Sequence, residues 1–206
     1  MSLTFYFAPQ SSASPVACAL AELDVEHERV RLDLKAKDQK KPGFLALNPN
    51  GKVPTLVVDG TPMFEALAIM LFLGERFGVE RGLWPAAKDP ARLTALSWCA
   101  WSYVSYAGQL GLLAYATSEH VSAEVHNPAQ AALARQELNR LLDVLEGRLG
   151  QQQFLLGASY SLADLVVASV VGYGVWVGQG VEGHPRVKAW LEAFQSRPCF
   201  KAVFES

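Results

Sequence analysis

The chain has little of what several classes of protein require. Only three of its 206 residues are cysteines, and Cys18, Cys99 and Cys199 lie far apart, so we expect no disulfide framework, no metal site and a reducing, cytoplasmic location. The longest apolar run, residues 165–171, falls well short of the ~20 residues that span a bilayer. The first apolar stretch follows no charged leader, which predicts no signal peptide. A formal net charge of −2 without a basic stripe argues against a nucleic-acid partner.

Half of the residues are hydrophobic and 18% are charged, which indicates a globular chain. Residues 1–78 predict a small α/β domain, because strand and helix patterns alternate there. Residues 79–90, rich in Gly and Pro, predict a linker, and residues 91–206 predict an all-helical domain. The expected strands are 3–7, 27–34, 54–59 and 62–64, and the expected helices are 14–23, 65–77, 91–116, 128–147, 162–173 and 185–196.

One motif marks a helix start with particular clarity. In Ser161-Leu-Ala-Asp164 an acid follows a serine by three residues, directly ahead of the apolar run 165–171. Such a pair forms a capping box, in which the two side chains bind the first free backbone N–H groups of the helix. Because the helix is almost wholly apolar, we expect it to be buried.

Three motifs together resemble the cytosolic glutathione S-transferase superfamily, with beta-like and phi-like features of bacterial-type members. They are Asn48-Pro-Asn-Gly-Lys-Val-Pro-Thr-Leu56, Phe64-Glu-Ala-Leu-Ala-Ile69 and Ser161-Leu-Ala-Asp164, followed by His184-Pro-Arg-Val-Lys-Ala-Trp190. The resemblance covers nearly the whole chain. It implies a thioredoxin-like, glutathione-binding domain followed by an all-helical domain with a hydrophobic substrate site.

The resemblance implies a set of residues that bind glutathione. Val53, before a cis bond to Pro54, would pair through its backbone with the cysteinyl backbone of glutathione. Glu65 and the N–H of Ala66 would hold the γ-glutamyl end, although similar proteins carry Ser in place of Ala66. The missing hydroxyl removes one hydrogen bond, about 0.5–1.5 kcal/mol, and predicts weaker binding.

The polar loop before Pro42 offers further candidates. In phi-like members a similar stretch binds the glycine carboxylate of glutathione, a role that Gln39 and Lys40 could fill. A solvated lysine loop explains the same residues nearly as well. Lys52, beside the Val53 backbone, is better placed for this carboxylate.

The catalytic position of the family lies between the first strand and the first helix. A hydroxyl that donates to the sulfur of glutathione favours its thiolate, and Ser11 or Ser12 can supply it. Counting as in phi-like proteins gives Ser11, and counting as in beta-like proteins gives Ser12. Ser14 is expected to cap the helix, and turn chemistry is the alternative role for each of these serines.

Aromatic residues of the long helix 91–116 suggest where an electrophile binds. We expect Phe7, Tyr103 and Tyr106 at an apolar substrate site, although such a stripe is more often core. The absence of Cys at the reactive turn favours conjugation over thiol oxidoreduction.

The sequence thus predicts a glutathione transferase that joins glutathione to small apolar electrophiles in detoxification. The family resemblance also implies a homodimer, and we expect neither a membrane nor a nucleic-acid partner. The alternatives are a non-catalytic ligand-binding or assembly module on the same fold, or a glutathione-dependent isomerase or peroxidase.

Overall fold

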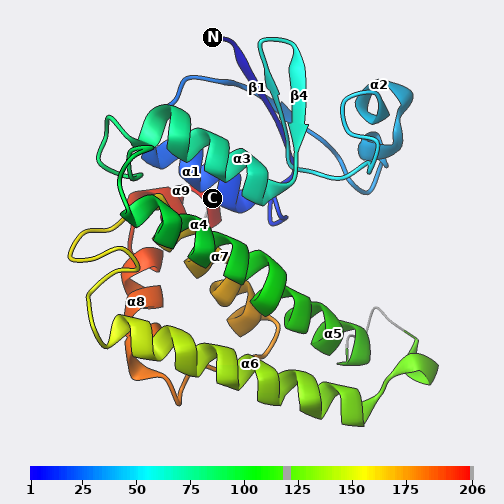
Figure 1. Ribbon diagram of the computed structural model, residues 1–206. Helices are drawn as coiled ribbons and strands as arrows, with labels where there is room; N and C mark the ends of the chain where they lie inside the picture. The colour runs from blue at the N-terminus through cyan, green and yellow to red at the C-terminus, as the bar shows by residue number, and fades with distance from the viewer. Residues whose placement is uncertain (118–121, 205–206) are drawn as a thin grey trace. The chain divides into compact units, whose positions relative to one another are not determined.

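A computed structural model describes residues 1–117 and 122–204 and divides the chain into two compact units (Figure 1). The first unit joins Met1–Asp89 to the C-terminal segment that starts at Gln195, and the second comprises Pro90–Phe194. The C-terminal segment groups with the first unit, whereas the sequence predicted one helical domain for all residues from 91 onward.

The first unit is built on one four-stranded sheet of order β2-β1-β3-β4. Its central strand β1 runs parallel to β2 and antiparallel to β3, and β3 pairs with β4 as a hairpin. Phe5 in the middle of β1 and Leu56 in β3 are register partners, and both are fully buried. The strands are β1 (Leu3–Phe7), β2 (Glu28–Arg31), β3 (Thr55–Val58) and β4 (Thr61–Phe64).

Two helices, α1 and α3, pack against each other beside this sheet (Figure 1). This order of strands and helices confirms the expected thioredoxin-like arrangement. Helix α1 begins at Ser14 with Ala13 in the capping position, so Ser14 is not the cap that the sequence predicted. The helices of this unit are α1 (Ser14–Glu22), η1 (Asp38–Lys40), α2 (Pro42–Leu45), α3 (Ala66–Leu73), the π turn η2 (Gly74–Gly78) and α9 (Pro198–Phe204).

Helix α9, which the sequence analysis did not foresee, is fastened to α1 by an ion pair. The Arg197 guanidinium donates to both carboxylate oxygens of Glu22, at 2.5 and 2.8 Å, and the Cys199 thiol donates to one of them at 2.9 Å. Burial alone would raise the pKa of Glu22, but the hydrogen bonds from Arg197 and Cys199 outweigh it and hold that pKa below its usual range. The carboxylate therefore stays charged and keeps both donors.

The regular elements of the second unit are all helices in the residues that the structure describes. The expected helix 91–116 is interrupted by a π turn, and none of the helices in the described part of the chain is long and apolar enough to cross a bilayer. Its helices are α4 (Ala91–Trp101), the π turn η3 (Ser102–Tyr106), α5 (Ala107–Thr117), η4 (Ala123–Val125), α6 (Pro128–Leu149), α7 (Leu162–Trp176) and α8 (Pro185–Gln195).

The capping box at the start of α7 forms the polar centre of this unit. Asp164, which is 0% exposed, accepts from the N–H of Ser161 at 2.9 Å and from its hydroxyl at 2.8 Å. Its other oxygen accepts from the N–H of Leu155 at 2.8 Å and from the indole N–H of Trp190 at 3.0 Å. Burial raises the pKa of Asp164 even though these four donors oppose that rise. One carboxylate thus joins α7, α8 and the loop before α7.

We expect Asp164→Asn to lower the free energy of unfolding by about 2–4 kcal/mol, because an NH₂ group then faces buried donors. Urea unfolding followed by circular dichroism measures this. The matched control is Asp143→Asn. Among the described residues the exposed Asp143 carboxylate bonds only the ring of His184, at 3.0 Å, so this variant should change stability by less than about 0.5 kcal/mol. Equal stability of the two variants would contradict a central role for Asp164.

Candidate functional site

Three segments converge at one end of the sheet. Thr55, the first residue of β3, pairs with Tyr6 near the end of β1 and with Phe64 at the end of β4. The turn after β1, the loop before β3 and the turn after β4 must therefore leave the sheet at the same end. These segments carry the two candidate serines, the Val-Pro pair and the Glu-Ala pair that the sequence analysis singled out.

The structure brings Ser12 and Val53 into direct contact. The Ser12 hydroxyl donates to the Val53 carbonyl oxygen at 2.7 Å, across 41 residues of sequence. The Val53–Pro54 peptide bond is cis, as the resemblance implied. The Ser12 side chain is exposed, whereas Val53 is buried. An accessible hydroxyl therefore lies beside the backbone expected to bind a peptide ligand.

Ser11 has a different environment. Its hydroxyl donates to the Ala8 carbonyl at 2.7 Å and accepts from the N–H of Ala13 at 3.1 Å. Its carbonyl also accepts from the N–H of Ser14 at 3.0 Å. Ser11 thus closes the turn that leads into α1, the kind of local bond that serine favours in turns. The two serines, equivalent in the sequence analysis, are distinguished by their partners.

Of the polar-loop candidates, Lys40 is tied to the loop before β3. Its ammonium donates to the Asn50 carbonyl at 3.2 Å, and it packs over Gly51, whose φ of +58° and lack of a side chain allow this approach. Gln39 makes one long contact, from its amide to the Leu34 carbonyl at 3.5 Å. The Lys52 side chain is exposed beside Val53. Lys40 therefore bonds to the loop that carries the Val53 backbone, and Lys52 is part of that loop.

Asn48 is a site residue that the sequence did not predict as such, since its pattern indicated only a turn. Asn48 is 2% exposed, and its side-chain NH₂ donates to the Lys52 carbonyl at 2.7 Å and to the Thr55 hydroxyl at 3.1 Å. Its side-chain oxygen accepts from the N–H of Asn50 at 3.1 Å. The bond from Asn50 forms an Asx turn, which the Asn-Pro-Asn-Gly pattern predicts. No pattern of neighbouring residues predicts the bond from Asn48 to Thr55.

Glu65 adopts a backbone conformation that non-glycine residues rarely take, with φ 71° and ψ 115°. Such strain persists where the surrounding structure fixes it, and it concentrates at functional sites. Glu65 is exposed and directly precedes α3, whose first residue is Ala66. The first N–H groups of α3 have no partner within the helix, so this turn can bind a carboxylate.

The residues expected at the electrophile site belong to different units. Phe7 stacks on Phe5 at 5.5 Å between ring centres, and the Arg29 guanidinium lies 4.6 Å above its ring. Tyr103 is half-buried within the π turn η3, an irregularity that is frequent at functional sites. Tyr106 is 0% exposed, so in this structure it is a core residue rather than an open site residue.

Tyr106 is buried between Trp101 and Gly174, and the missing side chain of Gly174 provides the space for its hydroxyl. Its ring lies 5.8 Å from that of Trp101, and its hydroxyl would be 2.9 Å from a Cβ atom placed on Gly174. Burial raises the pKa of the Tyr106 hydroxyl well above its usual range, so it stays neutral. The spacing of residues along the helix cannot predict that Tyr106 is buried and Tyr103 is partly exposed, because the contact that buries Tyr106 comes from Gly174 on α7.

None of the three cysteines is part of the converging segments, since they belong to helices α1, α4 and α9. All three are buried, and burial raises the pKa of Cys99 to about 12. Cys18 is 0% exposed on α1. Within residues 1–117 and 122–204 no group of three or more His, Cys, Asp or Glu side chains is arranged to hold a metal ion.

Known proteins resemble the chain along most of its length. The Glutathione S-transferase, N-terminal domain family matches residues 1–75, and the Glutathione S-transferase, C-terminal domain family matches residues 103–198. Glutathione S-transferase F13 of Arabidopsis thaliana is 33% identical over 91% of this chain and 88% of its own. Disulfide-bond oxidoreductase YfcG of Escherichia coli is 29% identical over 95% of this chain and 91% of its own.

A solved structure agrees with these matches. Glutathione transferase URE2P8 from Phanerochaete chrysosporium, crystallised with oxidized glutathione, superposes with a TM-score of 0.86 at 25% identity and covers 99% of this chain and 94% of that one. The chain therefore belongs to the glutathione S-transferase superfamily, and by its family it is a glutathione transferase enzyme. The expected fold, a thioredoxin-like unit followed by a helical one, is confirmed.

Proposed function

We propose that this chain binds glutathione, activates its thiol and transfers it to small apolar electrophiles, acting in the cytoplasm in detoxification. Residues 1–78 would bind glutathione, and the helical residues after the 79–90 linker would bind the electrophile. The observation that supports this most is the exposed Ser12 hydroxyl, which lies 2.7 Å from the Val53 carbonyl. It lies where a thiol would arrive once the Val53 backbone had paired with a cysteinyl peptide.

The surroundings of Ser12 suit a tripeptide with carboxylates at both ends. In the proposed complex the turn at Glu65 and Ala66 holds the γ-glutamyl end at the start of α3. Lys52, with Lys40 bonded to the same loop, attracts the glycine carboxylate through charge-assisted bonds. The rate then comes from two sources: a thiol pKa lowered by the Ser12 hydroxyl, and two reactants held together.

Tyr103 is the residue that we propose to contact the electrophile. It is partly accessible within the π turn of the helical unit, whereas the neighbouring Tyr106 is buried. Tyrosine offers an apolar ring and a polar tip, which suits a small electrophile with a polar leaving group.

The first test separates the two serines. A thiol has an ordinary pKa of about 8.5, and we expect it to be lower in the bound glutathione. Ser12→Ala should raise it back toward 8.5 and reduce kcat/KM at pH 7 by about 10- to 100-fold, the effect of one hydrogen bond to a charged group. Ultraviolet thiolate absorbance against pH and steady-state kinetics with an aryl halide measure both.

The matched control is Ser11→Ala. Because the Ser11 hydroxyl bonds the turn before α1, its loss should lower stability and leave the thiol pKa unchanged. A thiol pKa that rises in Ser11→Ala instead would reverse the assignment. Wild-type protein that binds no glutathione at millimolar concentration would favour a non-catalytic ligand-binding or assembly role.

A second candidate is glutathione-dependent disulfide reduction. It is supported by the relationship to Disulfide-bond oxidoreductase YfcG and by the oxidized glutathione in the URE2P8 structure. Two molecules of glutathione can reduce a disulfide to two thiols and become oxidized glutathione, so no protein cysteine is needed. The buried cysteines of this chain do not oppose such a reaction, but neither do they assist it.

One pair of assays decides between the candidates. We expect the protein to form the S-conjugate of an aryl halide faster than it forms oxidized glutathione from hydroxyethyl disulfide, each corrected for the uncatalysed rate. Mass spectrometry of the products distinguishes them. Disulfide reduction that exceeds conjugation would replace the first proposal with the second.

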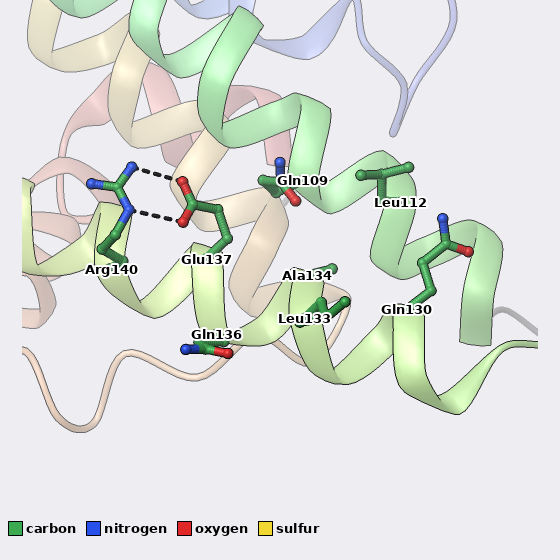
Figure 2. A pocket seen from close by; sticks show the side chains of 8 residues that line it. All are labelled: Gln109, Leu112, Gln130, Leu133, Ala134, Gln136, Glu137 and Arg140. Carbon is green, nitrogen blue, oxygen red and sulfur yellow. Dashed lines mark hydrogen bonds and ion pairs between the residues drawn. The ribbon is translucent and has the colours of Figure 1, made fainter.

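We also propose that the chain forms a homodimer through a groove on the helical unit, here called the α5–α6 groove, and Figure 2 shows the larger of its two cavities. It comprises a cavity of about 540 Å³ and an adjoining one of about 420 Å³. Arg140 and Glu137, paired at 2.7 and 2.8 Å, line both cavities. Four large apolar side chains that line the groove are exposed: Val104, Leu112, Leu133 and Val144.

Exposed apolar residues gathered along one face, with polar residues around them, are typical of a protein interface. A face that carries both signs of charge in one ion pair can bind a copy of itself across a two-fold axis.

Leu133→Arg should therefore convert the protein from twice the chain mass to the chain mass in light scattering, because a buried charge would lack a partner in the interface. The control is Val175→Arg, an exposed apolar position on α7 outside the groove, which should leave the mass unchanged. A Leu133→Arg protein that keeps the wild-type mass would exclude this face.

A further inference from the structure

In the Asn48 side chain both N–H hydrogens donate a hydrogen bond and the oxygen accepts one. Its NH₂ group has two hydrogens, one for the Lys52 carbonyl at 2.7 Å and one for the Thr55 hydroxyl at 3.1 Å. Its oxygen accepts from the N–H of Asn50 at 3.1 Å. Since only 2% of Asn48 is exposed, water does not substitute for these partners.

The two acceptors of Asn48 lie on either side of the Val53–Pro54 pair. Lys52 precedes the pair and Thr55 follows it. Thr55 is itself fixed, because it pairs in the sheet and is fully buried. A single amide therefore fixes both ends of the two-residue segment and connects it to the sheet.

The position of this segment reaches Ser12 through one contact. The Val53 carbonyl accepts the only hydroxyl hydrogen that Ser12 has, at 2.7 Å. A shift of the Val53 carbonyl must therefore move or release the Ser12 hydroxyl. Nothing else in the described residues is bonded to that hydroxyl.

We propose that Asn48 is a positioning residue for thiol activation: by holding Lys52 and Thr55 it sets the Val53 carbonyl, which in turn holds the Ser12 hydroxyl beside the place of the bound sulfur. This inference rests on the proposed function. Asn48 itself touches neither glutathione nor the electrophile. Its effect is transmitted through the backbone of Val53 and the side chain of Ser12.

The primary test is Asn48→Asp, which keeps the shape of the side chain and replaces its donor group with an acceptor. This acceptor faces the Lys52 carbonyl, so that hydrogen bond is lost, whereas the Thr55 hydroxyl can turn and donate to it. We expect the Kd for glutathione to rise by about 3- to 10-fold, the effect of one lost hydrogen bond in the binding backbone. We also expect the pKa of the bound thiol to rise toward its ordinary value although Ser12 is intact. Calorimetry and thiolate absorbance against pH measure the two quantities.

The matched control is Asn50→Asp. It introduces the same charge two residues away, but Asn50 joins this network only through its backbone N–H and carbonyl. We expect this variant to keep the wild-type Kd within about twofold and the wild-type thiol pKa. If the Kd and the thiol pKa rise equally in both variants, the added charge and not the lost donor group explains the effect, and the inference is overturned.

A second pair of variants guards against a failure of Asn48→Asp to fold. Thr55→Val removes one acceptor of Asn48 with almost the same shape, and Thr55→Ser keeps it. The thiol pKa should rise in Thr55→Val and return to the wild-type value in Thr55→Ser. Equal thiol pKa values in the two variants would overturn the inference even if both were less stable.

The double variant with Ser12→Ala tests whether Asn48 acts through Ser12. In that background Asn48→Asp should still raise the Kd but cause no further rise in the thiol pKa, because the hydroxyl that it orients is gone. A further rise of the same size as in the wild-type background would overturn the inference. Wild-type protein that fails to bind glutathione overturns the proposed function, and this inference with it.

Discussion

The candidate site depends on how strand β3 is anchored at Thr55. The backbone of Thr55 pairs with Tyr6 on one side and Phe64 on the other, so three strands end at the same level. Its hydroxyl accepts the amide of Asn48, which connects the preceding loop to the sheet. In a residue that is 0% exposed, none of these partners is replaced by water. A slip of β3 by one residue would turn this hydroxyl to the other face and separate the loops.

In the helical unit too, one buried polar residue fixes several segments through its hydrogen bonds, and here that residue is charged. Asp164 lies in the interior with four donors, so the start of α7, the loop before it and the Trp190 indole have one relative arrangement. Replacing any of them leaves an unpaired polar group in the core, which costs more than the bond contributed. Two motifs that the sequence presents separately, around Ser161 and around Trp190, are two parts of one network.

The sequence predicted the features that neighbouring residues determine. It missed the features that depend on contacts between distant parts of the chain. Strand alternation, the turn before β3 and the capping box at Ser161 act locally, and each was found. The choice between Ser11 and Ser12 was left open, because the partner of Ser12 lies 41 residues away. Helix α9 was missed, because a proline that ends one helix can also open the next, as Pro198 does.

A serine hydroxyl has one hydrogen, and this fact shapes the proposed mechanism. Before glutathione arrives, the Ser12 hydrogen is engaged by the Val53 carbonyl at 2.7 Å. A thiolate is a stronger acceptor than a neutral carbonyl, so the hydroxyl would turn to the sulfur. The carbonyl is then left with the cysteinyl N–H of glutathione and no buried acceptor goes unpaired.

A simple thiol brings no such N–H, so activating it would leave the Val53 carbonyl without a partner. The site would therefore favour a peptide thiol by hydrogen bonding rather than by the size of a pocket. Ala66 strengthens the argument: with one hydroxyl fewer at the γ-glutamyl end, the contact with Val53 carries a larger share of the recognition.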